Sequence, residues 1–275
     1  MNSITELQIN TLEEYLIENI NLLQELIEEK GMWEKVKENN DFALLFNFSF
    51  FAITKGVRSL KAAHLLAEEG FFEDILILLR SSYESYLHIS FLKKNPNQIH
   101  RLTTLKLLIK DKKLEHPKNK KQEDIKHKVI NPENGKEEIL SYSLKKISQN
   151  TMSETDGEIY DDLYMFLSEF SHVNFLAVGT FISSDEKIFT LKSKPSVMIF
   201  QTIILQLFVS WLLLESTSLF IPLNKKEKKK IDNQIKMSGM ILHNYILNFE
   251  IEDKRIINLK DNLINRLNET LKFYR

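Results

Sequence analysis

A stretch of 19 residues without a charged side chain, Ser196–Leu214, constrains the fold of this chain more than any other segment. Fourteen of these 19 residues are apolar, and a lysine-rich run follows at Lys225–Lys230, as in a transmembrane helix with a positive flank. Gln201 and Gln206 interrupt the segment, and glutamine is costly in lipid. A helix that is apolar on every side is also typical of the centre of a large bundle. We therefore predict a buried core helix and keep a membrane anchor as the alternative.

The composition favours long helices over many short strands. Only seven Gly and five Pro occur among 275 residues, so turn signals are few, and we predict an all-α, multi-helix bundle. The net charge of −1 excludes a basic field over the whole molecule. The absence of Cys excludes disulfides, thiolate metal ligands and a cysteine nucleophile. Residues 1–6 lack the features of a signal peptide, so we expect a cytoplasmic protein.

Capping residues and hydrophobic periodicity divide the chain into helices. Thr11 and Glu14 have the spacing of a capping box, and Gly31 is a stop signal, which predicts an acidic amphipathic helix between them. This helix suits packing in the bundle or the arm of a homodimer. Asn224 and Glu227 have the same capping-box spacing. Further helices are predicted at residues 41–70, 72–94, 98–115, 137–149, 153–181 and 251–273, with a lysine-rich insertion at 116–136 that ends in the turn Asn131–Gly135, and a loop or short hairpin at 183–195.

No linker rich in Pro, Gly or Ser interrupts this series of helices. We expect an N-terminal amphipathic helix at residues 1–40 and a helical core domain at 41–182. A C-terminal helical extension at 183–275 is expected to pack on that core.

A first polar stripe follows the apolar run Ile75–Leu79 and carries Arg80, Glu84 and His88 at spacings of four. Residues four apart lie on one face of a helix, so Arg80 and Glu84 are expected to form an ion pair. On the helix surface this pair would contribute only a few tenths of a kcal/mol. Facing inward across a bundle, the same residues could hold a phosphate and position a histidine. Composition and spacing leave both interpretations open.

A second stripe places Tyr164, Ser168 and His172 together, also at spacings of four. The acidic residues of this segment cluster on a neighbouring sector, which is the better candidate for the solvent face. His172 is therefore either a hydrogen-bonded residue at the border of that face or a candidate acid or base, because its ordinary pKa lies near neutrality.

Metal chemistry has little support in the sequence. His64 with Glu68, and Glu84 with His88, have the i,i+4 spacing of metal ligands, and a Glu-x-x-His pattern occurs once, at Glu169–His172, without a partner helix. No phosphate-binding loop, dinucleotide fingerprint or nucleophile elbow occurs. We expect no metal and no cofactor. Basic runs at 110–128 and 225–230 are either solvated surfaces or contacts for phosphate backbones.

The spacing of residues between 40 and 180 resembles a widespread bacterial all-α family of unknown function. The resemblance rests on Lys61-Ala-Ala, Gly70, an Arg-Ser-x-x-Glu signature at Arg80–Glu84 and the downstream Tyr164, Ser168 and His172. More distantly, it is similar to prokaryotic nucleotide-binding helical domains, many of which are metal-independent ribonucleases in toxin and phage-defence systems. Their Arg and His are separated by four to six residues, whereas seven residues separate Arg80 from His88.

This resemblance implies an intracellular protein that processes nucleotides or RNA, as a metal-independent ribonuclease or a nucleotide-phosphate hydrolase. Arg80, Glu84 and His172 would be its catalytic residues, with Lys61, Tyr164, Ser168 and His88 in support. Two alternatives stay open. One is a non-catalytic interaction or scaffold protein in which Arg80, Glu84 and His172 form a buried structural network. The other is a membrane-associated sensor anchored by 196–214.

Overall fold

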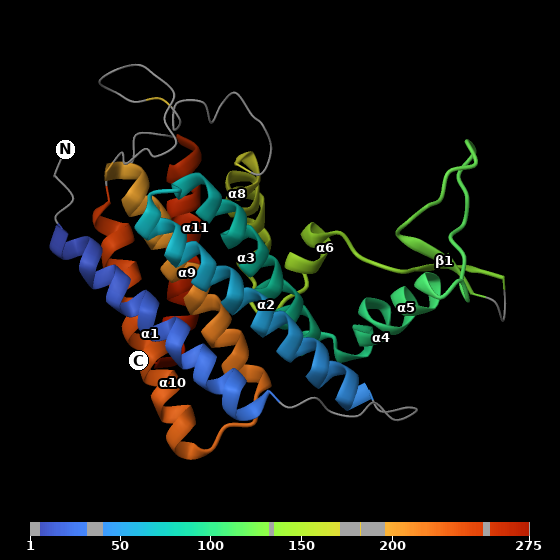
Figure 1. Ribbon diagram of the computed structural model, residues 1–275, viewed down its shortest axis with the longest axis horizontal. Helices are drawn as coiled ribbons and strands as arrows, with labels where there is room; N and C mark the ends of the chain where they lie inside the picture. Colours follow the sequence, from blue (N-terminus) through green and yellow to red (C-terminus); the bar gives the residue numbers. More distant parts are fainter. Residues whose placement is uncertain are drawn as a thin grey trace.

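The structure is a computed structural model that describes residues 6–31, 41–131, 135–170, 182, 196–249 and 254–274. Long helices dominate it (Figure 1). They are α1 (Glu6–Lys30), α2 (Asp41–Glu69), α3 (Phe72–Lys94), α9 (Ser196–Phe220), α10 (Lys225–Asn248) and α11 (Lys254–Leu271). The shorter elements are η1 (Pro96–Gln98), α4 (Ile99–Leu102), α5 (Thr104–Lys110), β1 (Lys128–Ile130), β2 (Glu137–Ile139), α6 (Leu144–Ser148), α7 (Asp156–Ile159), η2 (Tyr160–Tyr164), α8 (Met165–Glu169) and η4 (Lys272–Tyr274).

The apolar helix α9 is the centre of the bundle and packs against α1, α2, α3 and α10. The side chains of Leu207, Phe208 and Trp211 are completely buried, so the predicted core helix is confirmed, although it extends to Phe220 rather than Leu214. Among the described residues, Met198–Phe220 is one helix long and apolar enough to cross a membrane, and 78% of its most apolar window is buried in the protein. Burial against four neighbouring helices explains why this segment carries no charge.

Some polar groups in this core hydrogen-bond one another between helices. On α1, Asn19 donates to Ser210 of α9 at 3.0 Å, and Gln234 of α10 donates to Asn19 at 2.8 Å. Gly56 lets α2 approach α9 closely, because an added Cβ would lie 2.9 Å from a methyl group of Leu213 on α9. On α3, Ser82 donates to the Gly56 carbonyl at 2.9 Å. These contacts fix the position of α2 relative to α3, and α3 carries the first polar stripe.

Most predicted helix ends coincide with the observed ones. Gly70 adopts φ +80° directly after α2, and Gly31 follows the last residue of α1. Asn224 accepts from the backbone N–H of Glu227 at 2.9 Å, and the Glu227 carboxylate accepts from the Asn224 N–H, which confirms that capping box. The capping box predicted at Thr11 is wrong, because α1 already begins at Glu6 and Thr11 donates to the Leu7 carbonyl inside it.

The single helix predicted at 98–115 is broken into η1, α4 and α5. Thr103 interrupts it with φ −122° and ψ −77°, while its hydroxyl bonds the Ile99 carbonyl at 2.8 Å. Threonine side chains compete in this way with helical hydrogen bonds. Helix α5 ends at Lys110, and Lys112, two residues later, adopts a positive φ of +57°.

The helix predicted at 137–149 is also wrong in its first half. Residues 137–139 form β2, which pairs antiparallel with β1 so that Val129 faces Glu138. Of the turn predicted between the two strands, the described residues are Asn131 and Gly135: the Gly135 N–H donates to the Asn131 carbonyl at 2.8 Å, and Gly135 has a positive φ of +66°. Only 144–148 are helical, as α6, with Ser143 as the cap.

The long helix predicted at 153–181 begins instead at Asp156. Ser153 does not cap it, because the Ser153 hydroxyl donates to Glu269 of α11 at 2.6 Å. The run then widens into the π-helical turn η2 and continues as α8 to Glu169. Its predicted end at 181 and the loop predicted at 183–195 lie outside the described residues, apart from residue 182.

The described parts of all three predicted regions share one hydrophobic core. Leu16 of α1, Leu79 of α3 and Leu212 of α9 belong to the same cluster of buried side chains. By contrast, α5 and the hairpin β1–β2 project away from the bundle (Figure 1). The fold class is therefore an all-α bundle with a small projecting hairpin.

Candidate functional site

The first stripe contributes to a three-residue network between α3 and η2. Arg80 Nε donates to Glu84 Oε1 at 3.2 Å, as the i,i+4 spacing predicts, and Arg80 Nη2 donates to the Tyr164 hydroxyl at 2.5 Å. The same hydroxyl donates to Glu84 Oε1 at 3.2 Å. The guanidinium carbon of Arg80 also lies 4.6 Å from the centre of the Tyr164 ring. Both charged side chains are about one quarter exposed, so the network lies at the surface of the bundle rather than in its core.

The π-helical turn positions Tyr164 for these contacts. The rings of Tyr160 and Tyr164, the first and last residues of this turn, stack at 4.7 Å with an angle of 15° between their planes. Partial burial, and then the negative charge of Glu84, raise the pKa of Tyr164 above its ordinary value, although Arg80 opposes this. The hydroxyl therefore stays protonated and donates a hydrogen bond to Glu84.

His88 lies one turn beyond Glu84 on α3. Its Nδ1 is 2.8 Å from the Glu84 carbonyl oxygen, which can only accept, so Nδ1 carries the proton. Burial lowers the pKa of His88 below its ordinary value, and the positive charges of Lys106 and Lys55 lower this pKa further. The ring is therefore neutral at pH 7, with Nε2 as its unprotonated nitrogen.

The other predicted site residues are distributed differently. Ser168 donates to the Tyr164 carbonyl at 2.5 Å and so bonds the backbone of its own helix. Lys61 is exposed on α2 and donates to Gln24 of α1 at 2.7 Å, away from the network. His172 lies outside the described residues. The structure thus brings Arg80, Glu84 and Tyr164 together with His88 beside them, and leaves Lys61 apart.

A groove of about 370 Å³ lies along α2, and Leu78 of α3 completes its lining. The groove contains two cations and two hydroxyl groups, and the ring of Phe51 is 61% exposed at one end. Neither Lys55 nor Arg58 forms a hydrogen bond or ion pair within the described part of the chain. Phe51, Lys55, Arg58 and Ala62 follow helical spacing, a signal present in the sequence that we did not predict as a site. The groove is lined by Phe51, Thr54, Lys55, Arg58, Ser59, Ala62 and Leu78.

A second polar cluster, also not predicted, is mostly buried, and its most exposed member, Glu215, has a side chain that is 15% exposed. Arg266 of α11 is only 3% exposed and forms ion pairs with Asp156 and Glu215. Its Nη2 also donates to the Tyr86 hydroxyl at 3.1 Å, which in turn donates to Asp156 at 2.7 Å. Burial raises the pKa of Asp156, and the charge of Arg266 opposes that rise. Because Arg266, Asp156, Glu215 and Tyr86 bond one another across four elements, we infer that this cluster joins the helices.

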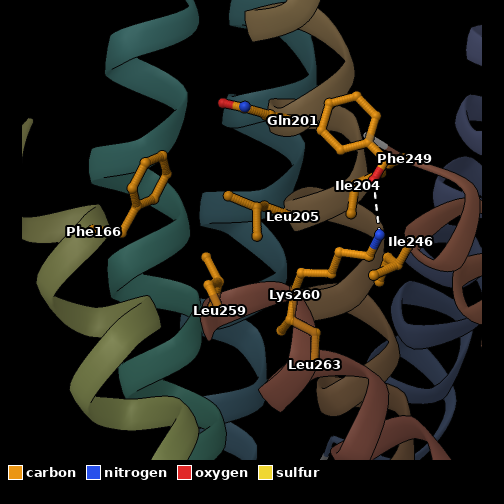
Figure 2. Close-up of a pocket in the computed structure, with 9 residues that line it drawn as sticks. All are labelled: Phe166, Gln201, Ile204, Leu205, Ile246, Phe249, Leu259, Lys260 and Leu263. Atoms are coloured by element: carbon orange, nitrogen blue, oxygen red, sulfur yellow. Dashed lines mark hydrogen bonds between the residues drawn. The ribbon is translucent and has the colours of Figure 1, made fainter. Parts of the chain in front are cut away.

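An apolar cavity opens between α8, α9, α10 and α11 (Figure 2). Lys260 closes one side and donates to the carbonyls of Leu247 at 3.0 Å and Phe249 at 2.8 Å. The cavity holds about 40 Å³, room for a few water molecules at most, so it is not a ligand site. Its lining consists of Phe166, Gln201, Ile204, Leu205, Ile246, Phe249, Leu259, Lys260 and Leu263.

Candidate metal ligands do not gather in the described ranges. No group of three or more His, Asp or Glu side chains that could hold an ion occurs there. His64 lies 3.9 Å from Glu13 of α1 rather than beside a second ligand from its own helix.

Comparison with protein families matches residues 46–189 to a family of unknown function, DUF5677. The chain belongs to this family. The matched residues carry the groove of α2, the Arg80–Glu84–Tyr164 network and the hairpin. The match confirms the predicted resemblance to a family of unknown function, whereas the signature residues and the similarity to ribonuclease-like domains stay predictions. No curated protein and no solved structure matches the chain. The DUF5677 match therefore identifies a family without assigning a reaction.

Proposed function

We propose that this DUF5677 protein binds a phosphate-bearing ligand, a nucleotide or a segment of RNA, on the face formed by α2 and α3. The supporting observation is the pair Lys55 and Arg58, two cations that line a groove without an acidic partner among the described residues. Thr54 and Ser59 add hydroxyl donors to the same groove. Charged donors of this kind are the usual ligands of phosphate oxygens. The exposed ring of Phe51 offers a surface on which a base can stack.

Arg80 and Glu84 of the Arg80–Glu84–Tyr164 network lie on the same helix, α3, that contributes Leu78 to the groove. Processing of the bound ligand would require a general base, and His88, neutral with Nε2 unprotonated, has the properties for that role. Arg80 would stabilise phosphate charge, and His172 stays a predicted catalytic residue. A ribonuclease assay of the wild type against Arg80→Ala, His88→Ala and His172→Ala tests this activity, and equal background cleavage in all four proteins would exclude it.

A second candidate function is a non-catalytic scaffold. It is favoured by the pairing of Arg80, whose donors contact Glu84 and Tyr164 and so tie α3 to η2. In that case the network would matter for stability and not for any reaction.

Calorimetric titration with ATP and AMP tests the binding proposal. The double variant Lys55→Gln/Arg58→Gln should weaken binding at least tenfold, because each lost charged contact costs about 1.5 kcal/mol or more. Lys61→Gln on the same helix is the matched control, because this exposed lysine contacts α1 instead. Undiminished binding by the double variant, or no binding by the wild type, would exclude the groove as a nucleotide site.

A further inference from the structure

The basic insertion forms an arm, which we define as the described residues 104–131 and 135–139 and which projects from the bundle (Figure 1). Residues 106–128 of the arm contain nine lysines against four acidic residues, although the whole chain has a net charge of −1. Eight of these lysines are exposed; only Lys128 is partly covered, and it pairs with Glu137 at 2.7 Å. With histidines taken as neutral, nine lysines and four acidic residues give this stretch a formal net charge of +5.

The tip of the arm is a fixed turn. Asn119 Oδ1 accepts from the backbone N–H groups of Lys121 at 2.8 Å and Glu123 at 3.0 Å. The Asn119 N–H donates to the Glu123 carbonyl at 2.9 Å, and Gln122 adopts φ +67° to complete the turn. This turn presents Lys118, Lys120 and Lys121 to solvent, and none of these three forms an ion pair within the described residues.

The second basic run, on α10, differs in this respect. Lys228 pairs with Asp232 at 2.9 Å and Lys230 pairs with Glu25 at 2.6 Å. Glu227, inside the same run, pairs with Lys30. Ion pairs thus compensate much of the charge on α10, whereas Lys118, Lys120 and Lys121 at the tip of the arm form no ion pair among the described residues.

The arm is connected to the groove at its base. Helix α4 packs against α2, and α5 follows directly. Lys106 of α5 and Lys55 of the groove both act electrostatically on His88 of α3. The base of the arm and the groove are therefore joined through α2, and exposed lysines lie on both.

We infer that the groove and the arm form one continuous surface for a single-stranded polynucleotide, which the arm holds by its phosphodiester backbone. This inference rests on the proposed function, and it names a strand rather than a mononucleotide as the ligand. A single nucleotide bound in the groove would leave the exposed lysines of the arm without a contact, whereas a longer strand could reach both. Such contacts recognise charge and spacing, not base sequence.

Fluorescence anisotropy with a labelled 20-nucleotide RNA, and with a DNA of the same sequence, tests the inference. In the triple variant Lys118→Gln/Lys120→Gln/Lys121→Gln, strand binding should weaken at least tenfold at 0.1 M salt. The slope of log K against log salt should fall by about 2, from roughly 0.7 per phosphate contact. Binding of ATP should not change. Tighter binding of the RNA than of the DNA would identify RNA as the strand.

The control is Lys225→Gln/Lys226→Gln/Lys229→Gln, which removes three exposed charges from the α10 run and should leave strand binding at the wild-type level. Equal losses in the two triple variants, or wild-type strand binding by the arm variant, would overturn the inference while ATP binding still supports the groove. Strand binding that depends on the arm but not on Lys55 and Arg58 would overturn the continuous surface, whereas the proposed function is decided separately by the titration with ATP.

Discussion

Tyr164 is the residue on which the network between α3 and η2 depends. Its hydroxyl accepts from Arg80 and donates to Glu84, and its ring supports the guanidinium. Tyr164, which is distant in the sequence, thus links the ion pair of Arg80 and Glu84 on α3 to η2. This explains how a pair worth little by itself can hold two elements together.

We expect Tyr164→Phe to lower the free energy of unfolding by about 1 kcal/mol, because it removes two hydrogen bonds to charged groups at a partly exposed site. Tyr160→Phe is the matched control: its ring stacks in the same way, and its hydroxyl forms no hydrogen bond among the described residues. Urea denaturation of both variants measures the difference. Equal changes in the two variants would show that the hydrogen bonds of the Tyr164 hydroxyl contribute nothing measurable to the free energy of unfolding.

Sequence patterns predict some of these residues well. The spacing of Arg80 and Glu84 predicts their ion pair, because a helix fixes which residues are neighbours. The contact with Tyr164 could not be derived in that way, since 84 positions separate it from Arg80 and only the packing of η2 brings them together. Lys55 and Arg58 were overlooked because exposed cations on an amphipathic helix are usually solvated.

Helix α11 is joined to the rest of the bundle by the buried Arg266 cluster. The side chain of Arg266 reaches Asp156 of α7, Glu215 of α9 and Tyr86 of α3. Its neighbour Glu269 accepts from Ser153 and Thr155 at the start of α7. One C-terminal helix therefore fixes three elements that are separate in the sequence.

Arg266→Ala should destabilise the protein by about 3 to 5 kcal/mol, because it leaves two buried carboxylates without their cation. Exposed Asn265→Ala on the same helix should change stability little. If uncompensated charge is the cause, adding Asp156→Asn and Glu215→Gln to Arg266→Ala should restore part of the loss in thermal and urea unfolding. A triple variant no more stable than Arg266→Ala would instead point to lost packing.

Element boundaries were predictable where local chemistry decides them. Gly70 and the Asn224–Glu227 capping box end and begin helices through their own backbone and side-chain bonds. The errors lie where a distant partner competes: Ser153 bonds Glu269 instead of capping α7. The break at Thr103 is local, but its Thr-Thr sequence is compatible with a continuous helix as well.

At the scale of the molecule, the family and the fold do not coincide. The DUF5677 match ends at residue 189, before α9 begins, yet α9 packs against α1, α2 and α3. The matched residues therefore contribute the groove, the network and the arm, whereas their hydrophobic core is completed by a helix outside the match. The uncharged composition of 196–214 predicted this central position, and its neighbours could be learned only from the structure.

A fragment of residues 1–195 should consequently fail to fold cooperatively. It lacks α9, so buried side chains such as Leu79 and Ile53 would lose their packing partners. Circular dichroism should show helix content with a broad thermal transition, in contrast to a sharp transition for the whole chain. A sharp transition in the fragment would show that the DUF5677 region has a core of its own.

The central position of α9 also has a consequence for the order in which the protein is made. Helices α1, α2 and α3 leave the ribosome well before residues 196–220 are translated, and domains fold only when their parts are present. The apolar faces that will receive α9 stay without their partner during that interval. Closure of the bundle is therefore timed by translation of the last third of the chain, which makes a chaperone that covers apolar helix faces most useful just before α9 emerges.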